Sequence, residues 1–336
     1  MKSMKKRILT GDRPTGRLHL GHYVGSLRNR VKLQEEYDCY FIVADLHTLT
    51  TRPEKTGELS GHIKDLVLDY LSVGINPEKS TIYLQSEIPE VTELAFIFSN
   101  LVTVPRLERL PTLKDVMRDA DIKIPSLGLL SYPVLQSADI LMVKANLVPV
   151  GRDQASHIEV TREIARSFNQ MYSETFPVPE ALIPDDIGTL PGTDGKAKMS
   201  KSAGNVINLS DDSDTVKKKV IGMYTDPKRV HGDEPGEVEG NPVFVYLRAF
   251  ATEKESKRVK ELEDRYKKGT VKDVEVKEFL VEVLVEFLEP IRQRRDKLEK
   301  EEGLVEKILK EGTQKAREEA RKTLDDVRST MKLSLF

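Results

Sequence analysis

Two histidines and several glycines lie close together near the start of the chain. The segment from Gly11 to Gly25 reads G-D-R-P-T-G-R-L-H-L-G-H-Y-V-G and follows a short apolar run, Ile8 and Leu9. His19 and His22 are three residues apart, so the first turn of a helix would place both on one face. A glycine-containing turn between a strand and a helix can hold phosphate, because backbone N–H groups converge there. The segment predicts a nucleotide site; a metal site on the histidines is the alternative, with no third ligand nearby to support it.

A second group of cations lies far downstream, in a glycine-rich segment. Residues 190–204 read L-P-G-T-D-G-K-A-K-M-S-K-S-A-G, with lysines at 196, 198 and 201. Glycine, proline and small polar residues predict a loop that can change conformation. Such a loop could close over a triphosphate and stabilise the charge that develops on leaving pyrophosphate. A basic surface loop without a role is the alternative, and the histidine segment disfavours it.

A carboxylate in an otherwise apolar helical run marks a third region. Asp139 lies within S-Y-P-V-L-Q-S-A-D-I-L-M-V, where a charge without a partner would be costly. Tyr132, Gln136 and Asp139 are separated by four and three residues, so a helix would place them on one face. They predict a small polar pocket with apolar walls. A helix cap, or a buried pair with arginine or lysine, is the alternative.

Polar residues also follow two of the apolar runs that we interpret as strands. Gly151 and Asp153 come directly after residues 148–150. Asp153 could accept a hydrogen bond from a ribose hydroxyl or serve as a helix N-cap, and Gln154 could reach the pocket beside it. His47, in A-D-L-H, could line the same pocket. For three further polar residues we expect structural roles or domain contacts: His157, Glu159 and Arg162.

The elements that must position these groups alternate along the first part of the chain. Strand candidates cover residues 7–9, 40–44, 81–85 and 148–150, and helical patterns cover 23–36, 57–73, 92–102, 128–144 and 154–168. This alternation predicts βαβ units and an α/β fold with a doubly wound, Rossmann-like parallel sheet. Ligands of such sheets bind at the carboxyl ends of the strands. The three regions should therefore meet at one edge of the sheet.

The composition changes after about Asn208. From there to residue 302 the chain reads as charged helices interrupted by a loop rich in proline and glycine, residues 224–242. We therefore expect a first domain over residues 1–207 and a second, helical domain over 208–302. A last helical pattern covers residues 304–331. We expect the segment 303–336 to return to the first domain, although its periodicity alone does not require this.

The overall charge and the single cysteine limit the partners of the protein. The formal net charge is −2, so RNA would have to bind to local basic stretches such as residues 2–7, 257–268 and 292–300. Solvated helix faces with i,i+4 ion pairs are the alternative. Cys39 permits neither an internal disulfide nor a cysteine metal cluster. No signal peptide or membrane-length apolar run is visible, so we expect a cytoplasmic protein without membrane or DNA partners.

Two of these motifs together resemble a known family. H-L-G-H at 19–22 and K-M-S-K-S at 198–202 resemble the two signature elements of class I aminoacyl-tRNA synthetases. The segment V-P-V-G-x-D-Q-x-x-H-I-E-x-T-R from Val148 resembles tryptophanyl-tRNA synthetases rather than the tyrosyl enzymes, and the resemblance runs from Ile8 into the helical part. It implies activation of L-tryptophan by ATP and Mg²⁺, followed by transfer to tRNA(Trp). It also implies a homodimer whose helical domain recognises the anticodon.

The resemblance also implies roles for single residues. The aspartate that matches Asp139 accepts the indole N–H, and the residues that match Tyr132 and Gln154 hold the amino group. The aspartate that matches Asp153 contacts the ribose. The predicted tryptophan site comprises Tyr132, Gln136, Asp139, Gln154, His47, Val148 and Val150. The predicted catalytic residues are His19, His22, Lys198 and Lys201. The predicted ATP site comprises these four and Arg13, Thr15, Gly21, Gly151, Asp153, Met199 and Ser200.

The chain departs from the family pattern at three places. Arg13 stands where many members have glutamine, Gln136 where they have methionine, and Val116 where they have a second lysine after Lys114. Three other functions stay open: the same chemistry on tyrosine, a small-molecule adenylyltransferase, and an RNA-binding protein without catalytic activity. Within the first domain, residues 92–118 are our expectation for the dimer surface.

Overall fold

A parallel β-sheet of five strands forms the centre of the first part of the chain. The computed structural model describes residues 5–151, 154–183, 190–195, 199–201, 203–226, 229 and 234–333. The strand order is β3-β2-β1-β4-β5, and every neighbouring pair is parallel. The order reverses between β1 and β4, and this switch point is where doubly wound sheets bind ligands. The strands are β1 (Arg7–Asp12), β2 (Asp38–Val43), β3 (Ser80–Leu84), β4 (Leu147–Pro149) and β5 (Glu180–Leu182).

The predicted α/β fold class is confirmed, and so are four of the strands. The fifth strand, β5, was not expected. It has only three residues, all of them exposed or partly exposed, and pairs with the sheet edge at β4. So short a strand shows no alternation of apolar and polar residues, which is the sequence signal for a strand.

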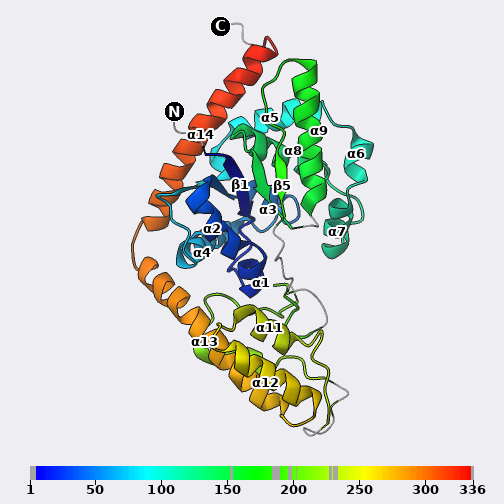
Figure 1. Cartoon of the computed structure of the whole chain (residues 1–336). Helices are drawn as coiled ribbons and strands as arrows, with labels where there is room; N and C mark the ends of the chain where they lie inside the picture. The colour runs from blue at the N-terminus through cyan, green and yellow to red at the C-terminus, as the bar shows by residue number, and fades with distance from the viewer. Residues whose placement is uncertain are drawn as a thin grey trace.

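Helices cover both faces of this sheet (Figure 1). The helix expected over 23–36 begins earlier, at Leu20, and contains a π-helical turn between its two α-helical parts. Two short helices, α6 and α7, were not expected, although each begins with a proline in its first turn, where proline is favoured. The helices up to residue 171 are α1 (Leu20–His22), η1 (Tyr23–Leu27), α2 (Arg28–Glu36), α3 (Asp45–Leu49), η2 (Thr56–Glu58), α4 (Leu59–Ser72), η3 (Gln85–Glu87), α5 (Glu90–Ser99), α6 (Val104–Glu108), α7 (Pro111–Asp119), α8 (Leu127–Met142) and α9 (Ala155–Met171).

Two apolar clusters fill the two faces of the sheet. Successive residues of a strand point to opposite faces, so Ile8 of β1 belongs to one cluster and Leu9 to the other. The cluster that contains Leu9 also holds the apolar sides of α5, α8 and α9. The cluster that contains Ile8 holds α4 and continues into the later part of the chain. Both faces are therefore buried, as a doubly wound sheet requires.

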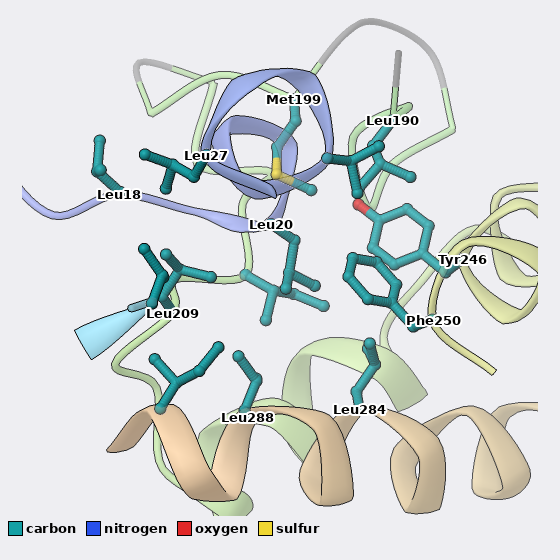
Figure 2. Close-up of a cluster of buried hydrophobic side chains, with 14 of the residues drawn as sticks. Leu18, Leu20, Leu27, Leu190, Met199, Leu209, Tyr246, Phe250, Leu284 and Leu288 are labelled. Atoms are coloured by element: carbon teal, nitrogen blue, oxygen red, sulfur yellow. The ribbon is translucent and has the colours of Figure 1, made fainter. Parts of the chain in front are cut away.

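Among the described residues between 208 and 302, the helices are α10 (Ser213–Ile221), α11 (Pro242–Phe250), α12 (Ser256–Lys267) and α13 (Asp273–Leu298). Their core is continuous with one face of the sheet. Leu20 and Met199 meet Tyr246, Phe250 and Leu284 in one group of buried side chains (Figure 2). Helix α13 also packs against α4. The expected domain boundary after residue 207 therefore crosses a shared core, and it stays a prediction.

The last helix, α14 (Leu304–Thr330), runs from the helical part back along the sheet (Figure 1). It packs against β3, where Thr313 Oγ1 accepts a hydrogen bond from the Leu84 N–H at 3.0 Å. A Cβ on Gly312 would lie 1.9 Å from the carbonyl oxygen of Ile82, so only glycine permits this approach. Ion pairs from Arg317 and Arg321 to Glu90 hold the helix to α5.

Candidate active site

The two histidines of the H-L-G-H motif lie side by side where the first long helix begins. His19 is the N-cap of α1, and its backbone N–H donates to Nδ1 of His22 at 3.2 Å. The two ring centroids are 3.8 Å apart. A Cβ at position 21 would lie only 3.0 Å from the His19 ring, so the lack of a side chain on Gly21 leaves room for this ring. The structure thus brings the two histidines to one face, as the spacing predicts.

The segment after the K-M-S-K-S motif pairs with the H-L-G-H motif. The N–H of Leu20 donates to the carbonyl of Ile207 at 3.0 Å, and the N–H of Leu209 donates to the carbonyl of Leu18 at 2.9 Å. Met199 is 4% exposed and packs into the same core as Leu20 (Figure 2). Two motifs that lie far apart in the sequence are therefore adjacent.

Lys201 reaches the turn that precedes the histidines. Its Nζ donates to the carbonyl of Gly16 at 2.8 Å and lies 3.4 Å from Oγ1 of Thr15. Burial lowers the pKa of Lys201, while Asp12 and Asp69 oppose that shift. Lys201 thus places a cation next to the turn that the sequence predicts as a phosphate site. Lys198 and Asp153, also predicted to bind ATP, lie outside the described residues.

A partly buried carboxylate, that of Asp12, lies at the end of β1. Oδ2 of Asp12 accepts from Arg30 Nη1 and from the hydroxyl of Tyr70, both at 2.7 Å. Burial raises the pKa of Asp12, but Arg30, His22 and these hydrogen bonds outweigh burial and hold the pKa at about 2. The ionised Asp12 therefore holds α2, through Arg30, to the end of β1. The histidine segment lies between these two elements in the sequence.

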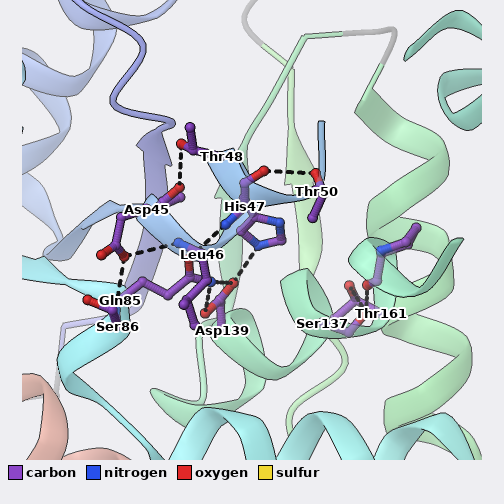
Figure 3. Close-up of polar contacts among 12 residues, drawn as sticks. Asp45, Leu46, His47, Thr48, Thr50, Gln85, Ser86, Ser137, Asp139 and Thr161 are labelled. Carbon is purple, nitrogen blue, oxygen red and sulfur yellow. Dashed lines mark hydrogen bonds and ion pairs between the residues drawn. The ribbon is translucent and has the colours of Figure 1, made fainter. Parts of the chain in front are cut away.

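Asp139 lies in a second polar group, together with His47 and Gln85 (Figure 3). It is 2% exposed, in α8. The Nε2 group of Gln85 donates to both of its oxygens, at 3.0 and 2.9 Å, and Nε2 of His47 lies 3.0 Å from Oδ2. Burial raises the pKa of Asp139, and the hydrogen bond and charge of His47 oppose that rise. The partners of Asp139 are therefore an amide and an imidazole, rather than the arginine or lysine of the structural alternative.

Tyr132 precedes Asp139 in α8 and has different polar partners. Its hydroxyl is 2.7 Å from Nε2 of His157, and Oγ1 of Thr112 approaches the same nitrogen. The rings of His47 and Tyr132 are 6.4 Å apart in an edge-to-face arrangement, so Tyr132 and Asp139 line one region. Burial raises the pKa of Tyr132, while Thr112 and the charge of Arg13 oppose this shift. Arg13 is thus close enough to act on the second polar group.

The other described residues of the predicted site lie on further segments of the first part of the chain and on the loop that carries Lys201. Val148 is buried in β4, Val150 packs against the same core, and Gln154 precedes α9 and bonds through its N–H to the carbonyl of Gly151. Gln136 is partly exposed on α8, and Ser200 bonds through its N–H to Asn205.

Gln85 and His157 take part in the second polar group, although the sequence analysis did not place them there. Gln85 was read as the last residue of a strand candidate, and we expected a structural role for His157. Gln85 is 1% exposed and binds Asp139, and His157 is 3% exposed and binds Tyr132. A polar residue that directly follows an apolar strand of a parallel sheet was the available signal for Gln85.

The arrangement of paired signature segments at the switch point of a parallel sheet defines a class of enzyme. The chain belongs to the class I tRNA synthetases of the tryptophan and tyrosine group, whose family model matches residues 1–289. Within the part of the chain that the structure describes, no helix has the length and apolar character to span a membrane.

Several proteins similar to this chain have a more specific name, tryptophan–tRNA ligase or tryptophanyl-tRNA synthetase. The tryptophan–tRNA ligase of Treponema pallidum is 56% identical over 330 residues, which cover 98% of this chain and 97% of that protein. The tryptophan–tRNA ligase of Borreliella burgdorferi is 54% identical over 336 residues, which cover 98% and 95%. The structure also resembles the tryptophanyl-tRNA synthetase from Campylobacter jejuni complexed with ADP and tryptophan. That comparison has a TM-score of 0.84, 34% identity, and coverage of 97% of this chain and 99% of the other.

Proposed function

We propose that the protein is a tryptophan–tRNA ligase. It activates L-tryptophan with Mg²⁺–ATP, releases pyrophosphate, and transfers the tryptophanyl group to tRNA(Trp). The observation that carries the proposal is the buried Asp139, whose polar partners are His47 and Gln85. The identity of 50–56% to tryptophan–tRNA ligases over nearly the whole chain supports the same substrate.

The tryptophan half of the site comprises Asp139, Gln85, His47, Tyr132 and His157. A carboxylate can accept about four hydrogen bonds, and Asp139 accepts two from Gln85 beside its contact with His47. Capacity remains for the indole N–H of tryptophan. An amino acid without that N–H would leave this acceptor capacity of the buried carboxylate unfilled, and such mismatches discriminate strongly.

Other side chains complete the tryptophan half in this proposal. Tyr132 and Gln154 hold the ammonium group of the amino acid. The ring of His47 and the side chains of Val148 and Val150 form the walls, and Gln136 lies beside them. Gln136 and Arg13 depart from the family pattern, so the contacts of the usual family residues are not carried over to these two positions.

The ATP half comprises His19, His22, Lys201 and, from the same loop, Lys198. The tryptophan carboxylate attacks the α-phosphorus in line, a new carboxyl oxygen–phosphorus bond forms, and the bond to pyrophosphate breaks. The attacking carboxylate is already ionised, so this step needs no general base. Catalysis consists of positioning and of stabilising negative charge on the phosphates. In the second step a ribose hydroxyl at the 3′ end of the tRNA takes the acyl group, and AMP leaves.

The rest of the ATP molecule would bind along the same edge of the sheet. Thr15, Gly21, Met199 and Ser200 adjoin the phosphates, while Gly151 and Asp153 adjoin the ribose. Mg²⁺ enters with the triphosphate as part of the substrate. Among the residues that the structure describes, no three His, Cys, Asp or Glu side chains are grouped to hold a metal ion.

The tRNA and a second copy of the chain are the proposed macromolecular partners. The helices α10 to α13 would recognise the anticodon, and residues 92–118 would form the dimer surface. Phe96 and Val104, in that stretch, are 73% and 54% exposed, which suits a surface that a partner covers. The cytoplasmic location also stays a prediction.

Amino-acid-dependent exchange of pyrophosphate into ATP tests this function. The assay is run without tRNA, with each amino acid separately. We expect exchange with tryptophan and none above background with phenylalanine. Exchange with tyrosine instead would keep the chemistry and change the substrate, and no exchange with any amino acid would contradict the proposal.

A further inference from the structure

A buried ion pair links the helical part to the first part of the chain. Arg295 of α13 donates from Nη1 to Oδ1 of Asp69 in α4 at 2.6 Å and to the carbonyl of Asp65 at 3.2 Å. Its other terminal nitrogen pairs with the Asp65 carboxylate. Asp69 is 0% exposed and the Arg295 side chain 4% exposed. Both charges are thus largely removed from water, and losing either partner would leave the other with less compensation for its buried charge.

The second oxygen of Asp69 holds the backbone that leads into the H-L-G-H motif. Oδ2 accepts from the N–H of Leu18 at 2.7 Å, and Leu18 directly precedes His19. Burial raises the pKa of Asp69 to about 6, against the opposing charge of Arg295 and the Leu18 N–H. Arg295 therefore helps to keep Asp69 ionised, and an ionised carboxylate is the stronger acceptor for this N–H.

The same short segment is held from the opposite side as well. The carbonyl of Gly16 accepts from Lys201 Nζ, and the carbonyl of Leu18 accepts from the Leu209 N–H. The position of His19 is therefore set jointly by the loop that carries Lys201 and, through Asp69, by α13. None of these contacts touches the tryptophan half.

We propose that Asp69 and Arg295 are positioning residues that couple the placement of α13 to the ATP half of the site. Their contact fixes the Leu18 backbone, and thereby the histidines that meet the phosphates. This inference rests on the proposed activation of tryptophan by ATP. It predicts that a side chain in the helical part controls the use of ATP and leaves tryptophan binding unchanged.

The test compares four variants of the full-length protein, among them the conservative Arg295→Lys, in tryptophan-dependent pyrophosphate exchange. Arg295→Gln removes the charge, and the double variant Asp69→Asn/Arg295→Gln removes both charges, so that neither stays buried alone. Arg294→Gln is the matched control, because Arg294 also ties α13 to α4, through the Ser72 carbonyl at 2.6 Å, but has no link to Leu18. The chain contains no tryptophan, so indole fluorescence reports the added amino acid alone and measures its binding directly.

We expect Arg295→Gln to raise the KM for ATP about tenfold and to lower kcat, since hydrogen bonds to charged groups contribute at this scale. Tryptophan affinity should stay within about twofold, and Arg294→Gln should leave both parameters within about twofold. The double variant should be no worse than Arg295→Gln, because the two residues act through one contact. Arg295→Lys should recover part of the loss, since it restores a cation beside Asp69.

Three results would overturn the inference. They are an unchanged KM for ATP in both Arg295→Gln and the double variant, an equal loss of ATP use and tryptophan affinity, or an equal effect of Arg294→Gln. The double variant keeps the test valid if Arg295→Gln alone does not fold. Wild-type protein without exchange would instead contradict the proposed function itself, so the two failures are distinguishable.

Discussion

The residues of the tryptophan half and of the ATP half of the proposed site come from differently distributed parts of the chain. Asp139, Gln85 and His47 come from helices that directly follow or cover the sheet, and they bind one another within a single buried group. The ATP half combines the segment before α1, the loop that carries Lys201, and, through Asp69, a helix near the end of the chain. In the proposed function, amino-acid choice would therefore be a local property of the sheet, whereas phosphate chemistry would depend on distant parts.

The contacts differ in kind as well. The tryptophan half is held by hydrogen bonds between buried side chains on regular elements. The ATP half is held mainly by backbone pairing between two segments, with one lysine and one aspartate at its sides. Substitutions in the first half should change which amino acid reacts, and substitutions in the second should change how ATP is used.

The largest effect should come from Asp139→Ala. Loss of the acceptor for the indole N–H should lower kcat/KM for tryptophan about 10³-fold in pyrophosphate exchange. ATP affinity, measured by calorimetry, should stay within about threefold. An equal collapse of ATP affinity would show that the two halves are not separable.

Lys201→Ala should have the second largest effect, on the opposite half. Removal of one cation that stabilises the phosphates should lower kcat about 10²-fold. Tryptophan affinity, followed by its own fluorescence, should not change. Lys79→Ala is the control, since Lys79 forms only an exposed ion pair with Glu35. A weaker binding of tryptophan in Lys201→Ala would contradict the assignment of Lys201 to the ATP half alone.

A smaller effect is expected for Gln85→Leu, which removes one partner of Asp139 and leaves the carboxylate in place. The kcat/KM for tryptophan should fall about tenfold, with an unchanged KM for ATP. Ser137→Ala is a matched control, because it also removes a buried hydrogen bond. That bond joins Ser137 to Thr161 and does not involve Asp139. Similar kinetics in the two variants would mean that Gln85 acts only through stability.

The smallest effect should be a pH-dependent loss of stability in Asp12→Asn. The pKa of Asp12 is about 2 in the folded protein, below its ordinary value of 3.8. Its contribution is therefore present above about pH 4 and is lost as the pH falls through the folded pKa. Urea unfolding should show a deficit of about 2 kcal/mol at pH 7 that narrows toward pH 3. A deficit that is constant with pH would contradict ionic stabilisation by Asp12.

Much of the fold and part of the site could be predicted from local patterns. Alternating strands and helices predicted a parallel sheet, and motif positions after strands predicted convergence at one edge. The spacing of Tyr132 and Asp139 predicted a shared region, and their side chains do line one. These signals work because each depends on residues that are neighbours in the sequence.

The missed features depend on pairs that are distant in the sequence. Asp69 and Arg295 are 226 residues apart, and each taken alone reads as an ordinary charge on a helix. The position of Gln85 after a strand is a local signal for a polar site, but its pairing with Asp139, 54 residues away, is not. The π-helical turn in the first long helix could not be recognised from the spacing of apolar residues, because Val24 and Leu27 within it are buried as in an α-helix.

The return of α14 to β3 has a consequence for association between chains. β3 is the last strand on its side of the sheet, and the outer edge of such a strand offers unpaired N–H and carbonyl groups to any other strand. Thr313 occupies one of these N–H groups, and Gly312 lets the helix backbone lie directly on Ile82. Helix α14 thus covers a strand edge to which strands of other copies could otherwise pair, and so disfavours aggregation through that edge.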